Sequence, residues 1–558
     1  MSNDMVIRGG TVIDGTGAPG RRADVAVRDG LITEIGDRLE GERELDADGQ
    51  VVAPGFIDIH THYDAQVFWD PALTPSSFHG VTSVVAGNCG FSIAPCHPEH
   101  RELIARTLQH VEDMNLATLE AGIPWDFETF PEYLQSVGRH GTLLNYGGYI
   151  GHTALRLFVM GDAGYEREAT PDEIDRMRQV IDEALTAGAI GFSSTTAPTH
   201  NGDGGRPVPS RVATLDEIAA LGSVLGERGQ GVVEITPGPT LAPNQMHELQ
   251  RRIGRPLTWT ALLTFKGFPW HEDVMKVTHQ AREDGLEVWP QVSCRPLTMQ
   301  MTLSEPFHFQ TVPHFAALAA LPVEERTARW ADPAWRAEGQ AALDAGKFLR
   351  PNWQNVSVAE TTSRSDLVGR PLSEIAAELG VRPLDVMAEV ALADGIQSTR
   401  FRTVLANDDE DGIETLLRET GATLVGLADS GAHVGQLCDA CVFTDLLGNW
   451  VRERGVLPLE EAVYRITGEP ARVFGLDNLE GGRGRIANGM AADVVVFDPD
   501  TVDPGPVRRV RDFPADAERL TADQPTGVTH VLVNGTPIRE NSKPAPLPEA
   551  LPGQLLRS

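Results

Sequence analysis

The sequence is poor in cysteine, in basic residues and in long apolar runs. Five cysteines among 558 residues are too few for a disulfide framework, and an odd count favours a reducing compartment. The segment Met1–Gly10 lacks the basic stretch followed by an apolar stretch that a secretion signal contains. No run reaches the roughly 18 consecutive apolar residues of a membrane-spanning helix. The sequence therefore predicts a cytoplasmic protein that does not enter a membrane.

Acidic residues outnumber basic ones, 79 to 47, which gives a formal net charge of −32. A surface this negative repels phosphate backbones and anionic lipid headgroups, so nucleic acids and membrane surfaces are poor partners. The apolar share of 41% is enough for a large core. We therefore expect a globular enzyme that acts on a small molecule, and the composition leaves open whether it forms a homo-oligomer.

Both ends of the chain have the pattern of short strands broken by turns. The first fifty residues carry β-branched runs separated by glycines and Asp-Gly pairs. Near the other end, Asp493–Phe497 and Thr529–Val533 are apolar strands, and Asn534-Gly535 is typical of a hairpin turn. We expect these two ends to form a small β domain, and the Pro-rich tail 542–558 to be loosely ordered.

The middle of the chain alternates helices with apolar strands. Thr170 and Glu173 predict a capping box, and Gly188 predicts the end of that helix. Nine segments are strand candidates, one more than a (β/α)8 barrel needs: Phe56–His60, Val81–Ala86, Leu144–Ile150, Ala189–Ser193, Val232–Thr236, Leu257–Leu263, Leu286–Val292, Phe401–Ala406 and Thr423–Ala428. This alternation predicts a parallel, TIM-like α/β barrel over residues 55–484, with a helical insertion near 304–347.

The sharpest local signal is the run Pro54-Gly-Phe-Ile-Asp-Ile-His-Thr-His62. Strand alternation places His60 and His62 on one face, with Asp58 on the same face. Two imidazoles at the carboxyl end of a barrel strand can reach one metal ion. An arbitrary His-X-His is more often a pair of surface histidines, but the preceding apolar strand and the β domain before it favour the metal site.

Several motifs together resemble the amidohydrolase superfamily, and within it the N-acyl-D-amino-acid deacylase (D-aminoacylase) branch. They are Val6–Gly17, Pro54–His62, Gly87–Ser92, Gly151–Arg156, Gly188–Ser193, Ala491–Asp493 and Val531–Gly535. The resemblance implies that residues 1–54 and 485–541 form one β-sandwich. It also implies metal-dependent hydrolysis of a non-peptide C–N bond, most simply the amide of an N-acyl-D-amino acid or a similar small N-acyl compound.

The resemblance also implies roles for Cys89 and Asp429. Cys89 occupies the position of a metal ligand in that branch, and a thiolate is an ordinary zinc ligand; without the family it is one small residue in a glycine turn. Asp429 follows the last barrel strand, where the family's aspartate binds metal and acts as a general base. It can equally cap the next helix.

The chain departs from the branch at two metal ligands, because neither the fifth nor the sixth strand contains histidine. Glu234, on the fifth strand, is the strong ligand type that alternation would point into the barrel. It could bind the metal, act as an acid or base, or hold a neighbouring cation, and His433 is another candidate for a missing imidazole. We therefore expect one zinc ion rather than two, held by His60, His62, Cys89, Asp429 and Glu234, with Asp429 and Glu234 as catalytic groups.

A long Gly/Pro loop, Thr199–Arg211, follows the fourth strand on the face expected to hold the active site. An arginine there could bind a substrate carboxylate bidentately. The sequence does not rank the substrate-binding candidates, which are His152, Arg156, Arg206, Arg211 and Arg295. Two other functions stay open: a metal-poor enzyme of the same fold with lyase or isomerase chemistry, and a catalytically inactive scaffold protein.

Overall fold

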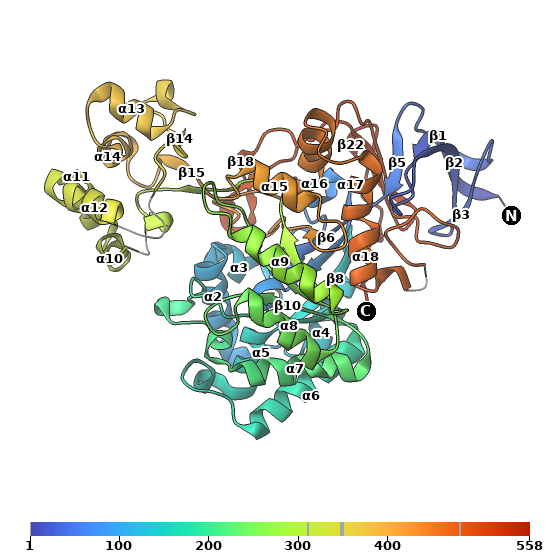
Figure 1. Cartoon of the computed structure of the whole chain (residues 1–558), viewed down its shortest axis with the longest axis horizontal. Helices are drawn as coiled ribbons and strands as arrows, with labels where there is room; N and C mark the ends of the chain where they lie inside the picture. The colour runs from blue at the N-terminus through green and yellow to red at the C-terminus, as the bar shows by residue number, and fades with distance from the viewer. Residues whose placement is uncertain (1, 310–311, 346–350, 479–480, 558) are drawn as a thin grey trace. The chain divides into compact units, whose positions relative to one another are not determined.

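A computed structural model describes residues 2–309, 312–345, 351–478 and 481–557 of the chain (Figure 1). The chain folds as two compact units. One comprises residues 1–295 and 409–558, and the other comprises residues 296–408. Among the described residues, none of the helices combines the length and the apolar character that crossing a bilayer requires.

Eight parallel strands of the first unit form the barrel sheet. In order around the sheet they are β6 (Phe56–Thr61), β7 (Val81–Ala86), β8 (Asn145–Gly151), β9 (Gly191–Thr195), β10 (Val232–Thr236), β11 (Leu257–Trp259), β12 (Val288–Val292) and β16 (Leu424–Val425). The segment after β16 returns to β6, because the His62 N–H donates to Ser430 O at 2.7 Å and the Asp429 N–H donates to His60 O at 3.1 Å. The first and last strands therefore meet at their carboxyl ends, as an α/β barrel requires.

The ninth strand candidate belongs elsewhere. Phe401–Ala406 lies in β15 (Arg400–Ala406), which pairs antiparallel with β13 (Leu297–Met301) and β14 (Val356–Glu360) in the second unit. Its apolar pattern resembles that of the barrel strands, so the sequence alone did not separate them. The helices α10 (Pro313–Ala316), α11 (Val323–Ala331) and α12 (Pro333–Ala345) of the expected insertion also fall within residues 296–408.

One barrel helix begins and ends where the sequence predicts. In α6 (Pro171–Ala187), Thr170 and Glu173 form the reciprocal capping box, and Gly188 takes a left-handed φ of 112° after the helix. Thr214 caps α7 (Leu215–Arg228) in a similar way, by accepting the backbone N–H of Glu217. Figure 1 shows α6, α7 and α8 (Met246–Ile253) following one another on the same side of the barrel.

Both chain ends contribute to a single nine-stranded sheet. Its strands are β1 (Asn3–Val12), β2 (Arg21–Arg28), β3 (Leu31–Gly36), β4 (Gly41–Asp46), β5 (Val51–Pro54), β17 (Val494–Phe497), β20 (Val528–Val533), β21 (Thr536–Glu540) and β22 (Lys543–Pro544). The two ends join where β5 pairs antiparallel with β17, with Val52 opposite Val496. Asn534 and Gly535 have positive φ values of 47° and 77° and form the predicted turn between β20 and β21.

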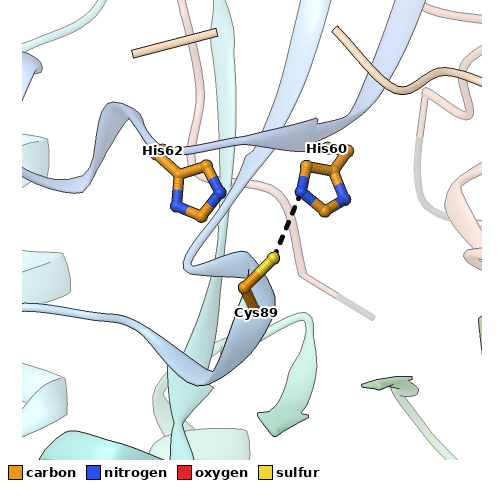
Figure 2. Close-up of side chains that lie close together, drawn as sticks. All are labelled: His60, His62 and Cys89. Carbon is orange, nitrogen blue, oxygen red and sulfur yellow. Dashed lines mark hydrogen bonds between the residues drawn. The ribbon is translucent and has the colours of Figure 1, made fainter. Parts of the chain in front are cut away.

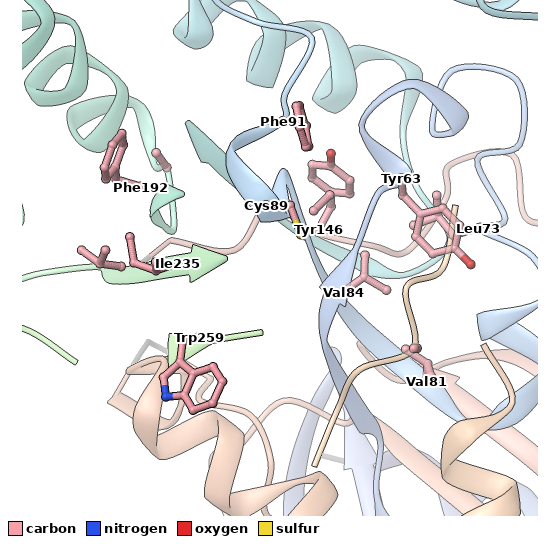
Figure 3. Close-up of a cluster of buried hydrophobic side chains, with 14 of the residues drawn as sticks. Tyr63, Leu73, Val81, Val84, Cys89, Phe91, Tyr146, Phe192, Ile235 and Trp259 are labelled. Carbon is pink, nitrogen blue, oxygen red and sulfur yellow. The ribbon is translucent and has the colours of Figure 1, made fainter. Parts of the chain in front are cut away.

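Two apolar layers lie on opposite faces of the barrel strands. Val233 and Ile235 of β10 belong to the largest core cluster, which includes side chains from the helices and is partly drawn in Figure 3. Val232, on the other face of β10, belongs to a second cluster with Ile57, Val85, Tyr149, Trp289 and Leu424 from other barrel strands. Because side chains alternate along a strand, Glu234 shares the inner face with Val232.

The end of the chain is packed rather than loosely ordered. Gly553 donates its N–H to Thr142 O at 2.9 Å, and Leu556 donates to Tyr146 O at 2.8 Å. The Leu556 side chain is 2% exposed and lies in the inner apolar cluster of the barrel. The prolines after Ser542 predicted a loosely ordered tail, but the apolar residues that follow them pack against the barrel.

Candidate metal centre

Three buried side chains from two neighbouring strands converge at the carboxyl end of the barrel. His60 is near the end of β6, His62 follows that strand, and Cys89 lies in the turn after β7. One ligand atom from each of these residues lies within 4.8 Å of the other two. The Cys89 Sγ is 3.5 Å from His60 Nε2, the contact drawn as a dashed line in Figure 2.

The Cys89 turn has an unusual backbone. Cys89 itself has a φ of 57°, and Gly87 and Gly90 on either side have φ values of 83° and 75°. A non-glycine residue in the left-handed region costs about 1–2 kcal/mol and persists only where the surroundings impose it. Here the Cys89 N–H donates to the Glu234 carboxylate at 2.8 Å, so β10 holds the turn in place.

Asp429 lies between the two histidines. Its Oδ1 is 3.2 Å from His62 Nε2 and 3.5 Å from His60 Nε2, and its side chain is 25% exposed, against 2% or less for the histidines. Burial favours the neutral acid, but the two imidazoles outweigh it and hold the pKa of Asp429 well below its usual range. The carboxylate is therefore ionised and open to an approaching molecule.

Glu234 points into the barrel and is fully buried. One carboxylate oxygen accepts the Cys89 N–H, and the other, Oε1, has no hydrogen-bond partner among the described residues. Burial raises the pKa of Glu234 to about 7, against the opposing influence of His60 and of the Cys89 N–H. An unpaired buried carboxylate oxygen is costly unless a proton or a cation compensates it.

The donor set fits a metal ion. Both ring nitrogens of His62 are buried and make no hydrogen bond within the described parts of the chain. Burial disfavours charged imidazoles, yet Cys89 and Asp429 raise the pKa of His60, and Glu112, Asp429 and Cys89 raise that of His62. The centre thus combines imidazole nitrogens, a thiol and carboxylates that together attract positive charge, and this N, S and O set suits zinc.

Three residues near the centre escaped the sequence analysis. Gln291 of β12 lies 2.7 Å from His60 Nδ1 through its Oε1. Glu112, after helix α2 (Arg101–Val111), lies 3.6 Å from His62 Nδ1. His200 lies in the Gly/Pro loop after β9, and its pKa is lowered to about 3 by burial, and then by His433 and His62. Only His200 had a sequence signal, the length of its loop.

The predicted substrate-binding residues fall in different places. Arg211 donates to His200 O at 3.1 Å, and its charge acts on His200. Arg206 is exposed and stacks on Tyr165, with its guanidinium carbon 4.3 Å from the ring centroid. Arg295 is paired with Asp439 at 2.7 Å and Asp445 at 3.2 Å.

His152 and Arg156 form a buried group with Glu217 of α7. His152 Nε2 lies 3.0 Å from Glu217 Oε1, and Arg156 contacts both carboxylate oxygens. Arg156 is fully buried and also donates to the carbonyl oxygens of Gly164 and Arg167. These contacts favour a structural role for the pair.

His433, the candidate for a missing imidazole ligand, lies outside the cluster of three ligand atoms. Its Nε2 is 3.8 Å from Glu112 Oε2.

Comparison with known proteins assigns the family. Residues 43–539 match the family described as the amidohydrolase family. The chain belongs to the amidohydrolase family. This amidohydrolase is 31% identical over 546 residues to a D-aminoacylase of Alcaligenes xylosoxydans xylosoxydans, covering 96% of this chain and 94% of the relative. The resemblance drawn from the sequence motifs is therefore confirmed.

Solved structures place the amidohydrolase beside deacylases. It is 28% identical to the N-acyl-D-glutamate deacylase of Bordetella bronchiseptica, solved with zinc and a phosphonate that mimics the tetrahedral intermediate, with a TM-score of 0.68 and 100% of each chain covered. It is also 28% identical to a D-aminoacylase whose binuclear metal centre is described by one-metal activation and second-metal attenuation, with a TM-score of 0.68 and 100% of each chain covered. Both cover the whole amidohydrolase chain.

Proposed function

We propose that this amidohydrolase is a metal-dependent deacylase that hydrolyses the amide bond of N-acyl-D-amino acids. The observation that carries the proposal is the convergence of His60, His62 and Cys89, with Asp429 within 3.5 Å of both imidazoles. The substrate class is taken from the relatives, which are a D-aminoacylase and an N-acyl-D-glutamate deacylase.

His60, His62 and Cys89 would hold the zinc ion, with Glu234 Oε1 and Asp429 as further oxygen ligands. When bound, zinc polarises the amide carbonyl and lowers the pKa of a coordinated water to about 7. Asp429 takes the proton from the attacking water, because it is ionised and more exposed than the histidines. The water oxygen joins the acyl carbon, the C–N bond breaks, and Asp429 returns the proton to the leaving nitrogen.

One zinc ion is proposed rather than two. The described fifth and sixth strands, β10 and β11, contain no histidine. A single carboxylate, Glu234, is available on that side, and one of its oxygens already accepts the Cys89 N–H. The one-metal activation described for the related D-aminoacylase is compatible with such a centre.

Arg211 is the proposed partner of the substrate carboxylate. It lies in the loop after β9, and its charge acts on His200, which the charges of His62 and Asp429 also reach. Arg206 of the same loop is the second candidate, since its guanidinium is exposed and stacks on the ring of Tyr165. Arg295 is engaged with two aspartates, and Arg156 with Glu217.

The wider expectations from the sequence stay predictions. We propose that the nine-stranded sheet of the two chain ends is the β-sandwich domain of residues 1–54 and 485–541, supported by the pairing of β5 with β17. A cytoplasmic location agrees with five cysteines that are all unpaired.

A substrate panel in labelled water tests the function. We expect release of the free amino acid from N-acetyl-D-amino acids, much slower release from the L-enantiomers, and one ¹⁸O atom from solvent in the acetate. His60→Asn/His62→Asn is the inactive control. A product without added water would favour the lyase or isomerase alternative. Turnover of no N-acyl compound, with a phenotype that survives the double variant, would favour the scaffold.

A further inference from the structure

The two metal-binding histidines present the same ring atom to the centre and turn the other ring atom outward. The Nε2 atoms of His60 and His62 both lie within 3.5 Å of Asp429 Oδ1. The outward Nδ1 atoms each face an oxygen of another side chain. For His60 that oxygen is Oε1 of Gln291, at 2.7 Å. For His62 it is Oε1 of Glu112, at 3.6 Å.

The contact with Gln291 sets the tautomer of His60. The Gln291 Nε2 donates to Thr258 Oγ1 at 3.2 Å, which leaves the carbonyl oxygen to face His60. A carbonyl oxygen can only accept, so His60 donates its Nδ1–H to Gln291 and presents Nε2 as the ring nitrogen that can bind a metal ion. A ligand histidine needs this arrangement, and His62 needs it as well.

Glu112 is placed to accept the Nδ1–H of His62, as Gln291 accepts that of His60. It is the residue after α2, is 3% exposed, and its N–H donates to Leu108 O at 2.9 Å. Its carbonyl oxygen accepts the N–H of His433, and its Oε2 lies 3.8 Å from His433 Nε2. The backbone of Glu112 is therefore held on both sides, and its carboxylate lies between the rings of His62 and His433, with Oε1 3.6 Å from His62 Nδ1.

The Glu112 carboxylate needs a hydrogen-bond donor, and the Nδ1 of His62 needs a hydrogen-bond partner. A buried carboxylate is stable only if a donor or a positive charge compensates it. The Nδ1 of His62 is buried and lacks a hydrogen bond in the part of the chain that the structure describes. Histidines that bind metal almost always donate the other ring N–H to a carboxylate, a carbonyl or a water, which fixes the tautomer and raises the basicity of the ligand nitrogen.

We propose that Glu112 is a positioning residue of the metal centre, which accepts the Nδ1–H of His62 and so holds its Nε2 ready for the metal. The inference rests on the proposed function, since it requires that His62 bind a metal ion. The separation of 3.6 Å exceeds a hydrogen bond, and bonds of this kind shorten when a site is assembled around its ligand. Glu112 itself does not touch the metal or the substrate.

Zinc affinity measured by chelator competition tests the assignment on the full chain. Glu112→Gln keeps the size of the side chain and removes its charge, and we expect zinc to bind about 10–100-fold more weakly. Glu112→Ala removes the acceptor as well and should weaken binding further. The matched control is Glu469→Gln, another fully buried glutamate, whose partners are Arg465 and Gly421, and its zinc affinity should equal that of the wild type.

A spectroscopic measurement separates positioning from a general structural role. Bound Co²⁺ reports its ligand geometry in the visible spectrum, so Glu112→Gln should shift those bands while Glu469→Gln leaves them in place. The proposal would be overturned if Glu112→Gln left both the zinc affinity and the Co²⁺ spectrum unchanged, whatever its melting temperature. Glu112 would then only hold the backbone of His433 through its carbonyl oxygen. If the wild type itself bound no zinc, the proposed function would fail first, and this inference with it.

Discussion

The backbone N–H of Cys89 donates a 2.8 Å hydrogen bond to the carboxylate of Glu234. This bond connects the turn after the second barrel strand to the fifth strand. It holds Cys89 at a left-handed φ of 57°, and the thiol lies 3.5 Å from His60 Nε2. One carboxylate oxygen thus accepts the Cys89 N–H, and the second oxygen, Oε1, is buried without a hydrogen-bond partner among the described residues. Because the fifth and sixth strands, β10 and β11, contain no histidine, the proposed metal site depends on Glu234 as its ligand from that side.

Glu234→Gln should lower both activity and metal retention by about 10–100-fold or more, because an uncharged amide is a poor ligand. Its oxygen can still accept the Cys89 N–H, so the melting temperature should change little. Glu234→Ala loses that bond and leaves a void, at a cost of about 2–5 kcal/mol in unfolding free energy. Metal analysis, kcat/KM and thermal unfolding of both variants check this. A fully active Glu234→Gln enzyme with normal metal content would refute the role.

Asp429→Asn should separate chemistry from metal binding. Without an ionised carboxylate to take and return the proton, kcat should fall by about 10²–10⁴-fold. The other four proposed ligands, His60, His62, Cys89 and Glu234, remain, so most of the zinc should be retained. Steady-state kinetics and metal content on the same preparation give both numbers. Loss of zinc in step with loss of activity would show that Asp429 serves only as a metal ligand, and would contradict its role as the general base.

Local motifs and alternation brought out much of this site from the sequence. The His60 and His62 pair follows from one short run, and Asp429 from the end of an apolar strand. Glu234 was expected to face the barrel interior from the alternation of side chains along its strand alone. Gln291 and Glu112 could not be found in this way, because they reach the histidines only through closure of the barrel and the position where α2 ends. The roles of all these residues remain predictions.

The same limit applies to the fold. Capping residues such as Thr170 and Gly188 fixed helix α6, since caps act over a few residues. The partner of a strand is decided by tertiary contacts, so Phe401–Ala406 could be recognised as a strand without its sheet. Leu556 is buried although it follows a Pro-rich stretch. A single apolar residue has no periodicity, so the sequence pattern did not predict its burial.

The buried group around Glu217 should make stability depend on pH. Burial opposes ionisation, but the His152 hydrogen bond and the Arg156 charge outweigh it and lower the pKa of Glu217 from 4.5 to about 2. A lowered carboxyl pKa contributes stability that is complete above about pH 4.5 and is lost as the pH falls towards 2. Glu217→Gln should therefore be about 3–5 kcal/mol less stable than the wild type at pH 7.

That difference should narrow as the pH falls below about 4.5, because the unfolded wild type then binds a proton that the folded protein does not. Urea unfolding of both proteins at pH 7, 5.5 and 4 measures it. A difference that is independent of pH over this range, or that grows in acid, would contradict the assignment of an ionised Glu217.

Leu556→Ala tests the packed end of the chain. The side chain is 2% exposed within the inner cluster of the barrel, so truncation should cost about 2–5 kcal/mol of unfolding free energy. Leu547→Ala is the matched control, because Leu547 is 61% exposed and should be neutral. Equal stability of the two variants would show that the tail does not contribute to the core in solution.

The central claim is that His60, His62 and Cys89 hold one catalytic zinc ion. The most direct measurement is the zinc content of the wild type purified without chelator, beside His60→Asn/His62→Asn and Cys89→Ala. The account predicts about one zinc per wild-type chain, with loss of metal and of deacylase activity together in the variants. Less than about a tenth of an equivalent in the wild type, with activity that added zinc does not raise, would contradict it.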